Sequence, residues 1–289
     1  MEKSPEELAK ERLARIEAAI NLKEPDKVPL WGVGGDIVAA YAGMTQHEFC
    51  YDYDKAVKAI EKFMRDFPFD TSMAGLMGLE GRIFCVAFSE FPDISPALSL
   101  ITGPMHDVLG DKYYRYPGRE IDENATPQFI GGTFMEPGEY DRLIEDPVGF
   151  VAETILPRAC TNLDTPRKAM ATWVRLGMEC SKFFSAAAEI GRVSAELGYP
   201  PFPMGWGYSP LDIIGDFLRG VGTVVLDIYR YPDKVKKATE ALTEPIANYA
   251  LYHKYMGAKY AMIPLHLNEY LSPKLYNEFY WPYLKAVIL

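Results

Sequence analysis

The segment His266-Leu267-Asn268-Glu269-Tyr270 holds the side chains best suited to chemistry. A histidine can shuttle a proton or bind a metal, and an asparagine can orient a carbonyl or a carboxylate. The segment follows an apolar run, residues 260–265, and precedes a helix that Ser272 can cap. In a parallel α/β barrel this place is the carboxyl-terminal face, where active sites gather. We predict catalytic roles for His266 and Asn268 and substrate binding by Glu269. The alternative is that His266 and Glu269 only bind loop backbone.

A glycine-rich loop, residues 32–36, is the second candidate site. Glycines after a strand can bring backbone amides close to an anion. The loop lacks the G-x-G-x-x-G pattern and the lysine of a phosphate-binding loop, which argues against nucleotide binding. We predict that Gly34, Gly35 and Asp36 bind substrate. The alternative for Asp36 is an N-cap of the residues that follow.

Two further groups could contribute to a site. Asp70 follows a short apolar segment and could act as a general base or as an acceptor for a pyrrole N–H, although a turn-forming aspartate is an equal alternative. Met204, Trp206 and Tyr208 alternate before a capped helix, so all three point the same way. We predict that Trp206 and Tyr208 wall a substrate pocket, with core packing as the alternative.

Strand-like and helix-like segments alternate along the chain, which favours a single parallel α/β domain over residues 1–289. Ser4 and Glu7 form a capping box at the first helix, and Ser209-Pro210 and Ser272-Pro273 each begin a later one. Apolar patterning predicts the other elements. They are strands at 28–33, 83–88 and 260–265, and helices from Asp54 and over 232–255.

Composition excludes several classes of protein. The 289 residues carry a net charge of -10 and have a pI of about 5.0, which argues against nucleic acid and anionic membranes as partners. There is no signal peptide and no membrane-spanning apolar run, so we expect a cytoplasmic protein. The four cysteines form no C-x-x-C pair, and we predict reduced thiols and no metal site.

Several motifs resemble those of the uroporphyrinogen decarboxylase superfamily. Glu24-Pro25-Asp26-Lys27-Val28-Pro29 is similar to its opening motif, and the segment 217–235 is similar to its helix with a following R-x-P-D/E-K-V. The segment 271–285 resembles its more specific L-S-P-x-x-(Y/F)-x-E-F-x-x-P-Y-x-K motif. The resemblance implies a TIM (β/α)8 barrel. By this comparison the chain lacks roughly the last two βα units, so we expect a barrel that is incomplete at its C-terminus.

The superfamily holds two chemistries, tetrapyrrole decarboxylation and zinc-dependent methyl transfer involving a corrinoid. The arginine-rich segment of the decarboxylases is replaced here by Trp31-Gly32-Val33-Gly34-Gly35-Asp36. The resemblance places the H-x-C zinc motif after residue 289, so it implies that a full-length parent could bind zinc, and we expect no cofactor within this chain. We therefore expect methyl transfer from a small donor to a corrinoid on a partner protein. The alternatives are decarboxylation of a tetrapyrrole, with substrate-binding cations such as Arg82, Arg115 or Arg119, and an inactive binding module.

Overall fold

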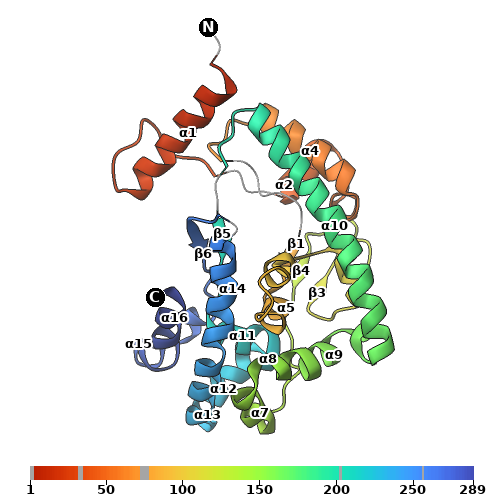
Figure 1. The fold of residues 1–289 in the computed structure, drawn as a ribbon, viewed down its shortest axis with the longest axis vertical. Helices are drawn as coiled ribbons and strands as arrows, with labels where there is room; N and C mark the ends of the chain where they lie inside the picture. The colour runs from red at the N-terminus through yellow and green to blue at the C-terminus, as the bar shows by residue number, and fades with distance from the viewer. Residues whose placement is uncertain (1–2, 32–34, 72–77, 202–203, 256) are drawn as a thin grey trace.

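The structure is a computed structural model that describes residues 3–31, 35–71, 78–201, 204–255 and 257–289. Helices dominate it (Figure 1). The first helix, α1 (Pro5–Ile20), begins at the predicted capping box: the amide of Glu7 donates to the Ser4 hydroxyl, and the amide of Ser4 donates to the Glu7 carboxylate. The predicted N-terminus of this helix is therefore confirmed.

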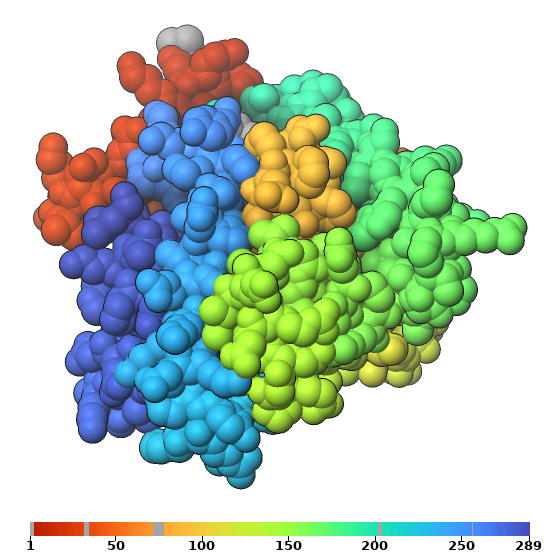
Figure 2. All heavy atoms as spheres, turned by 60° about the horizontal axis from the view of Figure 1, so that its bottom comes forward, coloured from red at the N-terminus to blue at the C-terminus, as the bar shows by residue number. Residues whose placement is uncertain are grey.

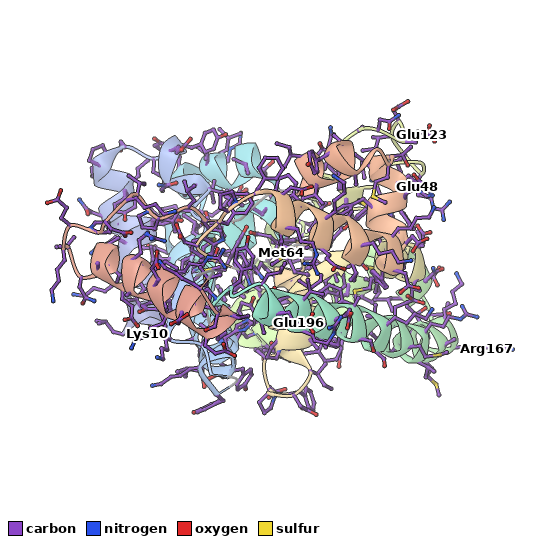
Figure 3. All side chains as sticks on the ribbon, turned by 90° about the horizontal axis from the view of Figure 1, so that it is seen from above. Lys10, Glu48, Met64, Glu123, Arg167 and Glu196 are labelled. Atoms are coloured by element: carbon purple, nitrogen blue, oxygen red, sulfur yellow. The ribbon has the colours of Figure 1, made fainter. Side chains whose placement is uncertain are left out.

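A layer of helices covers one side of the molecule. The long helix α10 (Pro166–Glu196) packs against α4 (Tyr53–Asp66), α2 (Gly35–Ala42) packs on α4, and α3 (Gln46–Tyr51) leads into α4. Figure 3 shows α10 running from Arg167 at one edge to Glu196 beside α1. Arg12 of α1 fixes this end by donating to the carbonyls of Leu197 and Gly198.

The described strands form three two-stranded sheets rather than a closed ring (Figure 1). Strands β1 (Gly78–Glu80) and β2 (Leu100–Thr102) are antiparallel, as are β3 (Tyr114–Arg115) and β4 (Gln128–Phe129). Strands β5 (Met204–Trp206) and β6 (Tyr260–Met262) are parallel. A barrel needs every strand to pair on both sides. The predicted (β/α)8 barrel is therefore not confirmed, and the described residues form a helix-rich mixture of α and β structure.

The carboxyl-terminal part keeps the predicted parallel βα arrangement. Between β5 and β6 lie α11 (Pro210–Ile213), the π-helical turn η5 (Ile214–Arg219), α12 (Val221–Arg230), α13 (Pro232–Ala241) and α14 (Thr243–Tyr255). The single helix predicted over 232–255 is wrong, because the helix is interrupted at Leu242 and the segment forms two helices. Pro245 is tolerated only in a first helical turn, so a new helix begins just before it.

Two predicted strands were also wrong. The apolar run 83–88 lies mostly within a helix, α5 (Arg82–Ala87), whose six residues are all buried. A short, continuous apolar run cannot distinguish a buried strand from a buried helix. Of the run 28–33, residues 28–31 are described and form no strand, although Leu30 exchanges hydrogen bonds with Asp70.

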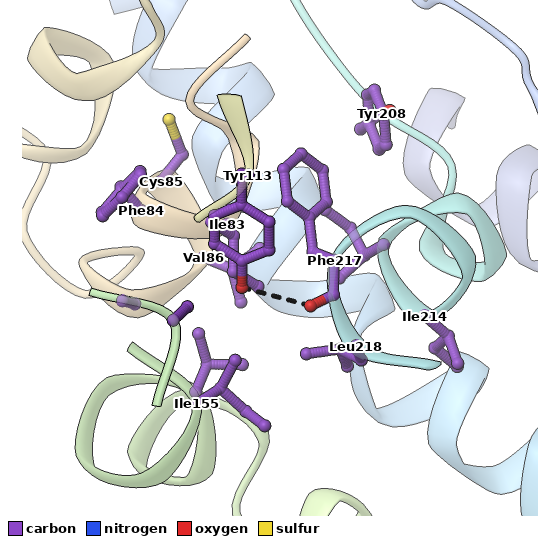
Figure 4. Close-up of a cluster of buried hydrophobic side chains, with 14 of the residues drawn as sticks. Ile83, Phe84, Cys85, Val86, Tyr113, Ile155, Tyr208, Ile214, Phe217 and Leu218 are labelled. Carbon is purple, nitrogen blue, oxygen red and sulfur yellow. Dashed lines mark hydrogen bonds between the residues drawn. The ribbon is translucent and has the colours of Figure 1, made fainter. Parts of the chain in front are cut away.

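The region 89–138 is built from short elements around buried tyrosines. It holds η1 (Ser95–Leu98), β2, α6 (Gly103–Leu109), β3, β4 and η2 (Pro137–Glu139). Tyr113, Tyr114 and Tyr116 are fully buried here. Tyr113 donates to the carbonyl of Phe217 at 3.1 Å, which joins this region to the C-terminal part (Figure 4).

Short helices after residue 139 complete the core. They are α7 (Tyr140–Glu145), α8 (Pro147–Phe150), the π-helical turn η3 (Val151–Ile155), α9 (Leu156–Ala159) and η4 (Thr161–Leu163). Figure 2 shows this segment packed against the helices that follow β5. Tyr140 donates to Asp227 at 3.0 Å across this contact, and Lys234 pairs with Asp141 at 2.8 Å.

The chain ends in η6 (Leu267–Tyr270), α15 (Pro273–Leu275), the π-helical turn η7 (Tyr276–Tyr280) and α16 (Trp281–Ile288). The predicted Ser272 cap is confirmed, since its hydroxyl accepts from the Leu275 amide. Among the helices of the described ranges, none combines the length and the apolar character that a membrane crossing needs. The assignment of residues 1–289 to one domain stays a prediction.

Candidate active site

The parallel pairing of β5 with β6 brings Tyr208 and His266 together. Both residues follow the carboxyl ends of their strands, and parallel strands present these ends at one edge. The ring centroids of Tyr208 and His266 lie 5.7 Å apart, and the Tyr208 oxygen lies 3.0 Å from His266 Nδ1. Two residues that the sequence singled out on separate segments therefore share one site.

Asp216 completes the cluster from the turn η5. Its Oδ2 accepts from the Tyr208 hydroxyl at 2.6 Å and lies 2.7 Å from His266 Nδ1. Because an ionised carboxylate only accepts hydrogen bonds, we assign the Nδ1 proton to His266. His266 Nε2 makes no hydrogen bond with a described residue, and the side chain is 39% exposed. Nε2 is therefore available for a hydrogen bond with a ligand.

The electrostatics of the cluster favour a protonated imidazole. The hydrogen bond to Asp216 raises the pKa of His266, and burial works against this shift without cancelling it. Burial, together with the charge of Asp216, raises the pKa of Tyr208. A histidine with a raised pKa and an outward-facing nitrogen can act as a general acid near neutral pH.

Asp212 fixes the backbone at His266 and Leu267 through hydrogen bonds. Its carboxylate accepts from the amides of His266 at 3.2 Å and Leu267 at 2.9 Å, and from the Tyr280 hydroxyl at 2.6 Å. The sequence reasoning missed both Asp212 and Asp216. One signal was available in the sequence. Asp212 and Asp216 are four residues apart after the Ser209-Pro210 helix start, and this spacing puts both on one helical face.

We expect Asp212→Asn to change how stability depends on pH. Burial raises the pKa of Asp212 to about 6 from 3.8, so the folded chain keeps a proton that the unfolded chain has released between those values. This group's contribution to the free energy of unfolding therefore falls as pH rises through that window. From pH 4 to pH 7, the free energy of unfolding of the wild type should fall by up to about 3 kcal/mol more than that of Asp212→Asn. Urea unfolding of both proteins at the two pH values measures this difference. Parallel curves for the two proteins would contradict this.

A cavity of about 710 Å³ opens beside His266. Its described lining includes Asp216, His266, Glu269 and Tyr270, together with the loop 129–133. Asp216 and Glu269 are its acidic residues, and no lysine or arginine is among the described lining residues. The lining therefore suits a neutral or cationic group better than a polyanion.

Two glycines let the loop 129–133 approach Asp216 closely. Gly131 has a φ of +70°, and a Cβ there would lie 2.9 Å from the Asp216 carbonyl oxygen. Gly220 has a φ of +80°, and a Cβ there would lie 2.9 Å from Thr133 Oγ1. Both backbone conformations favour glycine. The amide of Gly132 donates to the Asp216 carbonyl at 3.0 Å, which ties this wall to the cluster of Tyr208, Asp216 and His266.

Trp206 lies on the other side of Tyr208, over a buried arginine. The guanidinium carbon of Arg82 is 4.8 Å from the Trp206 ring centroid and 6.0 Å from that of Tyr208. Neither Trp206 nor Tyr208 is among the residues that line the 710 Å³ cavity. Arg115 and Arg119 lie outside its lining too, and Arg119 pairs with Asp107 at 2.8 Å.

The structure does not bring the other predicted residues into this cluster. Gly34 lies outside the described residues. Gly35 and Asp36 form the first turn of α2, and the Asp36 carbonyl accepts from Gln46. Asn268 lies in η6 beside His266 but not in the cavity lining, and its buried Oδ1 has no hydrogen-bond partner among the residues that the structure describes. The roles of these residues stay predictions.

Asp70 lies in a different, buried ion pair. Its Oδ1 is 2.5 Å from Arg15 Nη1, and its Oδ2 accepts from the Leu30 amide at 2.7 Å. Arg15 also pairs with Asp26 at 2.6 Å. These contacts join α1, the following loop and Asp70, which is the arrangement of a structural carboxylate. Asp70 is not among the lining residues of the cavity beside His266.

We expect Asp70→Asn to lower the free energy of unfolding by about 1–3 kcal/mol, because a charged acceptor of Arg15 is lost in a buried place. Urea unfolding measures this change, and turnover by the folded fraction should stay close to that of the wild type. An unchanged stability with a lost turnover would instead support the catalytic role predicted from the sequence.

The cysteines are separate from the cluster. Cys50, Cys85 and Cys160 are buried and Cys180 is partly buried, and burial raises the pKa of each thiol. Within the described ranges, no three His, Cys, Asp or Glu side chains are placed to hold a metal ion. The described residues thus do not supply a zinc site.

Comparison with known families places this site in a recognised context. Residues 204–289 match the family model described as uroporphyrinogen decarboxylase (URO-D). The matched segment contains β5, β6 and the Tyr208, Asp212, Asp216 and His266 side chains. Over this segment, the chain is similar to the uroporphyrinogen decarboxylase family. No curated protein matches the chain.

Proposed function

We propose that the chain is a methyltransferase-like enzyme that removes a methyl group from a small methyl ether or methylamine. The acceptor is a reduced corrinoid carried by a partner protein. One observation carries the proposal: His266, held by Asp216 through Nδ1, lines an acidic cavity that has no lysine or arginine in its described lining. The family is typically enzymatic and includes methyltransferase-like members, which is consistent with this assignment.

For a methyl ether donor, His266 supplies the proton that the reaction needs. The electron pair of the reduced corrinoid forms the new bond to the methyl carbon, and the pair of the broken carbon–heteroatom bond stays on the oxygen or nitrogen. An alkoxide is a poor leaving group, so a proton from His266 Nε2 lowers the barrier for a methyl ether, whereas a protonated methylamine already carries its proton and leaves as the neutral amine. Asp216 keeps the imidazole oriented and stabilises its protonated form.

The charge of the cavity distinguishes this reaction from decarboxylation of a polycarboxylate tetrapyrrole. Such a substrate needs several cations around it. The described lining instead carries Asp216 and Glu269, with His266 as its one titratable base. A neutral methyl ether or a protonated methylamine avoids the repulsion that a polyanion would meet there.

The test is methyl transfer to free cob(I)alamin, which stands in for the corrinoid protein. The chain is incubated with a panel of methyl ethers and methylamines, and methylcobalamin is followed by its absorbance. We expect formation that depends on one donor class. Uroporphyrinogen is tested in parallel by product analysis. Turnover of uroporphyrinogen without methyl transfer would support the decarboxylase alternative, and turnover of neither would support the inactive binding module.

A further inference from the structure

Helix α10 carries large apolar side chains on a face that no described element covers. The helix lies along one edge of the molecule and packs against α1, α4, α6 and η4 (Figure 1). On its outer face, Met170, Val174 and Met178 follow one another at intervals of four residues and are 73%, 66% and 61% exposed. Phe184 is exposed farther along the helix. A continuous apolar face of this kind commonly marks an interaction surface.

The exposed face repeats every seven residues. Two series of exposed positions run along it, and none of their members is charged: Met170, Gly177, Phe184 and Gly191 form one series, and Val174, Ser181, Ala188 and Ala195 form the other. The series alternate at intervals of four and three residues, as the contact positions of a two-helix coiled coil do. They extend over about 38 Å of helix. A repeat of this length indicates that a second helix lies along the face.

Two glycines of the repeat indicate a close approach by that second helix. Gly177 and Gly191 lie in the interior of α10, where glycine is less favourable than alanine. Apart from the backbone of the helix itself, a Cβ at either position would meet no heavy atom within 4 Å. Packing within the described chain therefore does not require glycine at these positions. A neighbouring helix that approaches closely does require small residues.

The two halves of the face are complementary in size. The N-terminal half carries the larger side chains, while Ala188, Gly191 and Ala195 make the C-terminal half small. When a second copy of α10 lies antiparallel, one register places a large side chain opposite a small one at most positions. The opposed residues are then Met170 and Ala195, Val174 and Gly191, Gly177 and Ala188, and Ser181 and Phe184. A parallel copy would instead place methionine opposite methionine and glycine opposite glycine.

The charges beside the face follow the same register. They are also spaced by seven residues: Lys168, Arg175, Lys182, Glu189 and Glu196. The antiparallel pair places Lys168 opposite Glu196 and Arg175 opposite Glu189, and twofold symmetry makes each pair occur twice. Arg175 has no ion pair with a described residue, so it is available for this contact. Lys182 meets its own copy, and Glu179 at 2.6 Å offsets that repulsion.

We propose that the exposed face of α10 is a dimer interface, and that a second copy of this chain covers it with its own α10 antiparallel. A groove of about 900 Å³ between α4 and α10 fits this arrangement. Its lining includes Val57, Ala186 and Ser185, and the register places Met178 of the second copy opposite Ser185. No residue of α10 is among the described lining of the cavity beside His266, so the dimer leaves that cavity open in both copies.

The experiment is sedimentation equilibrium of the chain over a hundredfold range of concentration, up to about 100 µM. We expect the mass to rise toward twice 32.6 kDa. Val174→Glu should weaken dimerisation at least tenfold, because it places a charge in an apolar contact twice. Leu226→Glu on α12 is the matched control, since Leu226 is also exposed, and it should dimerise like the wild type.

Exchange of the flanking charges tests the antiparallel register. Arg175→Glu and Glu189→Arg should each weaken dimerisation at least threefold, because each change places like charges opposite one another twice. An equimolar mixture of the two variants should regain most of the wild-type affinity, since opposite charges then meet at both places. Circular dichroism spectra establish that each variant is folded.

A chain that stays monomeric at the highest concentration would overturn the proposal. A dimer that persists unchanged in Val174→Glu would place the contact on another face and would overturn it too. Weakening by both charge variants without recovery in their mixture would contradict the antiparallel register.

Discussion

Replacing His266 by asparagine is expected to lower the rate constant of methyl transfer from a methyl ether by about 10²- to 10⁴-fold, the usual contribution of a general acid. The KM for the donor should change little, because asparagine keeps the polar character and much of the volume of the side chain. The measurement is the rate of methylcobalamin formation at saturating donor, with wild-type and variant chains compared at the same pH.

A second donor sharpens this prediction. A quaternary ammonium donor releases a neutral amine, which needs no proton. The loss in His266→Asn should therefore be large for the ether and less than about tenfold for the quaternary donor. His47→Asn is the matched control, since His47 contacts the Pro117 carbonyl and is not among the residues that line the cavity. Equal losses with both donors would mean that His266 does not act as the acid.

Phe217→Ala is expected to lower the free energy of unfolding by about 3–5 kcal/mol, which is typical for removal of a fully buried ring. Phe217 is 1% exposed. Its ring centroid lies 5.3 Å from that of Tyr113, 5.1 Å from that of Phe129 and 6.2 Å from that of Tyr208. Figure 4 shows Phe217 between Tyr113 and Tyr208. The ring thus joins the core to one wall of the site, and urea unfolding measures its contribution.

Phe91→Ala is the control, because it removes a phenyl ring that is not buried. Phe91 is 49% exposed, and its loss should change the free energy of unfolding by less than about 1 kcal/mol. If both variants lost the same stability, the core assigned around Phe217 would be wrong. If Phe217→Ala lost little, the packing between Tyr113, Phe129 and Tyr208 would not depend on this ring.

Local signals predicted the helix ends better than they predicted the strands. The caps at Ser4 and Ser272 depend on one side chain and a nearby amide, so a few residues suffice to specify them. The run 83–88 carries no such signal, because a continuous apolar segment can be buried as a helix or as a strand. The pairing of distant strands depends on the whole chain, and here β5 and β6 are the parallel pair in the matched segment.

Only part of the site was predicted, again because local signals can be read from the sequence and contacts between distant residues cannot. His266 and Tyr208 stood out because each follows an apolar run and precedes a Ser-Pro helix start, although only Ser272 caps its helix with its side chain and Ser209 does not. Asp216 and Asp212 looked like ordinary helical carboxylates, and only the fold shows that their oxygens meet His266 and its backbone. Arg82 was considered only as a cation for a tetrapyrrole, since its burial under Trp206 depends on contacts between residues far apart in the chain.

The pKa of His266 tests the central claim most directly, because it reports the proton that the proposed reaction uses and needs no substrate. Nuclear magnetic resonance of the imidazole nitrogens, with His266→Asn used to assign the signal, gives this value. We predict a pKa above the ordinary value of 6.5, and a lower one in Asp216→Asn. A His266 pKa at or below 6.5, unchanged by Asp216→Asn, would contradict the claim that Asp216 holds a proton on His266 for transfer.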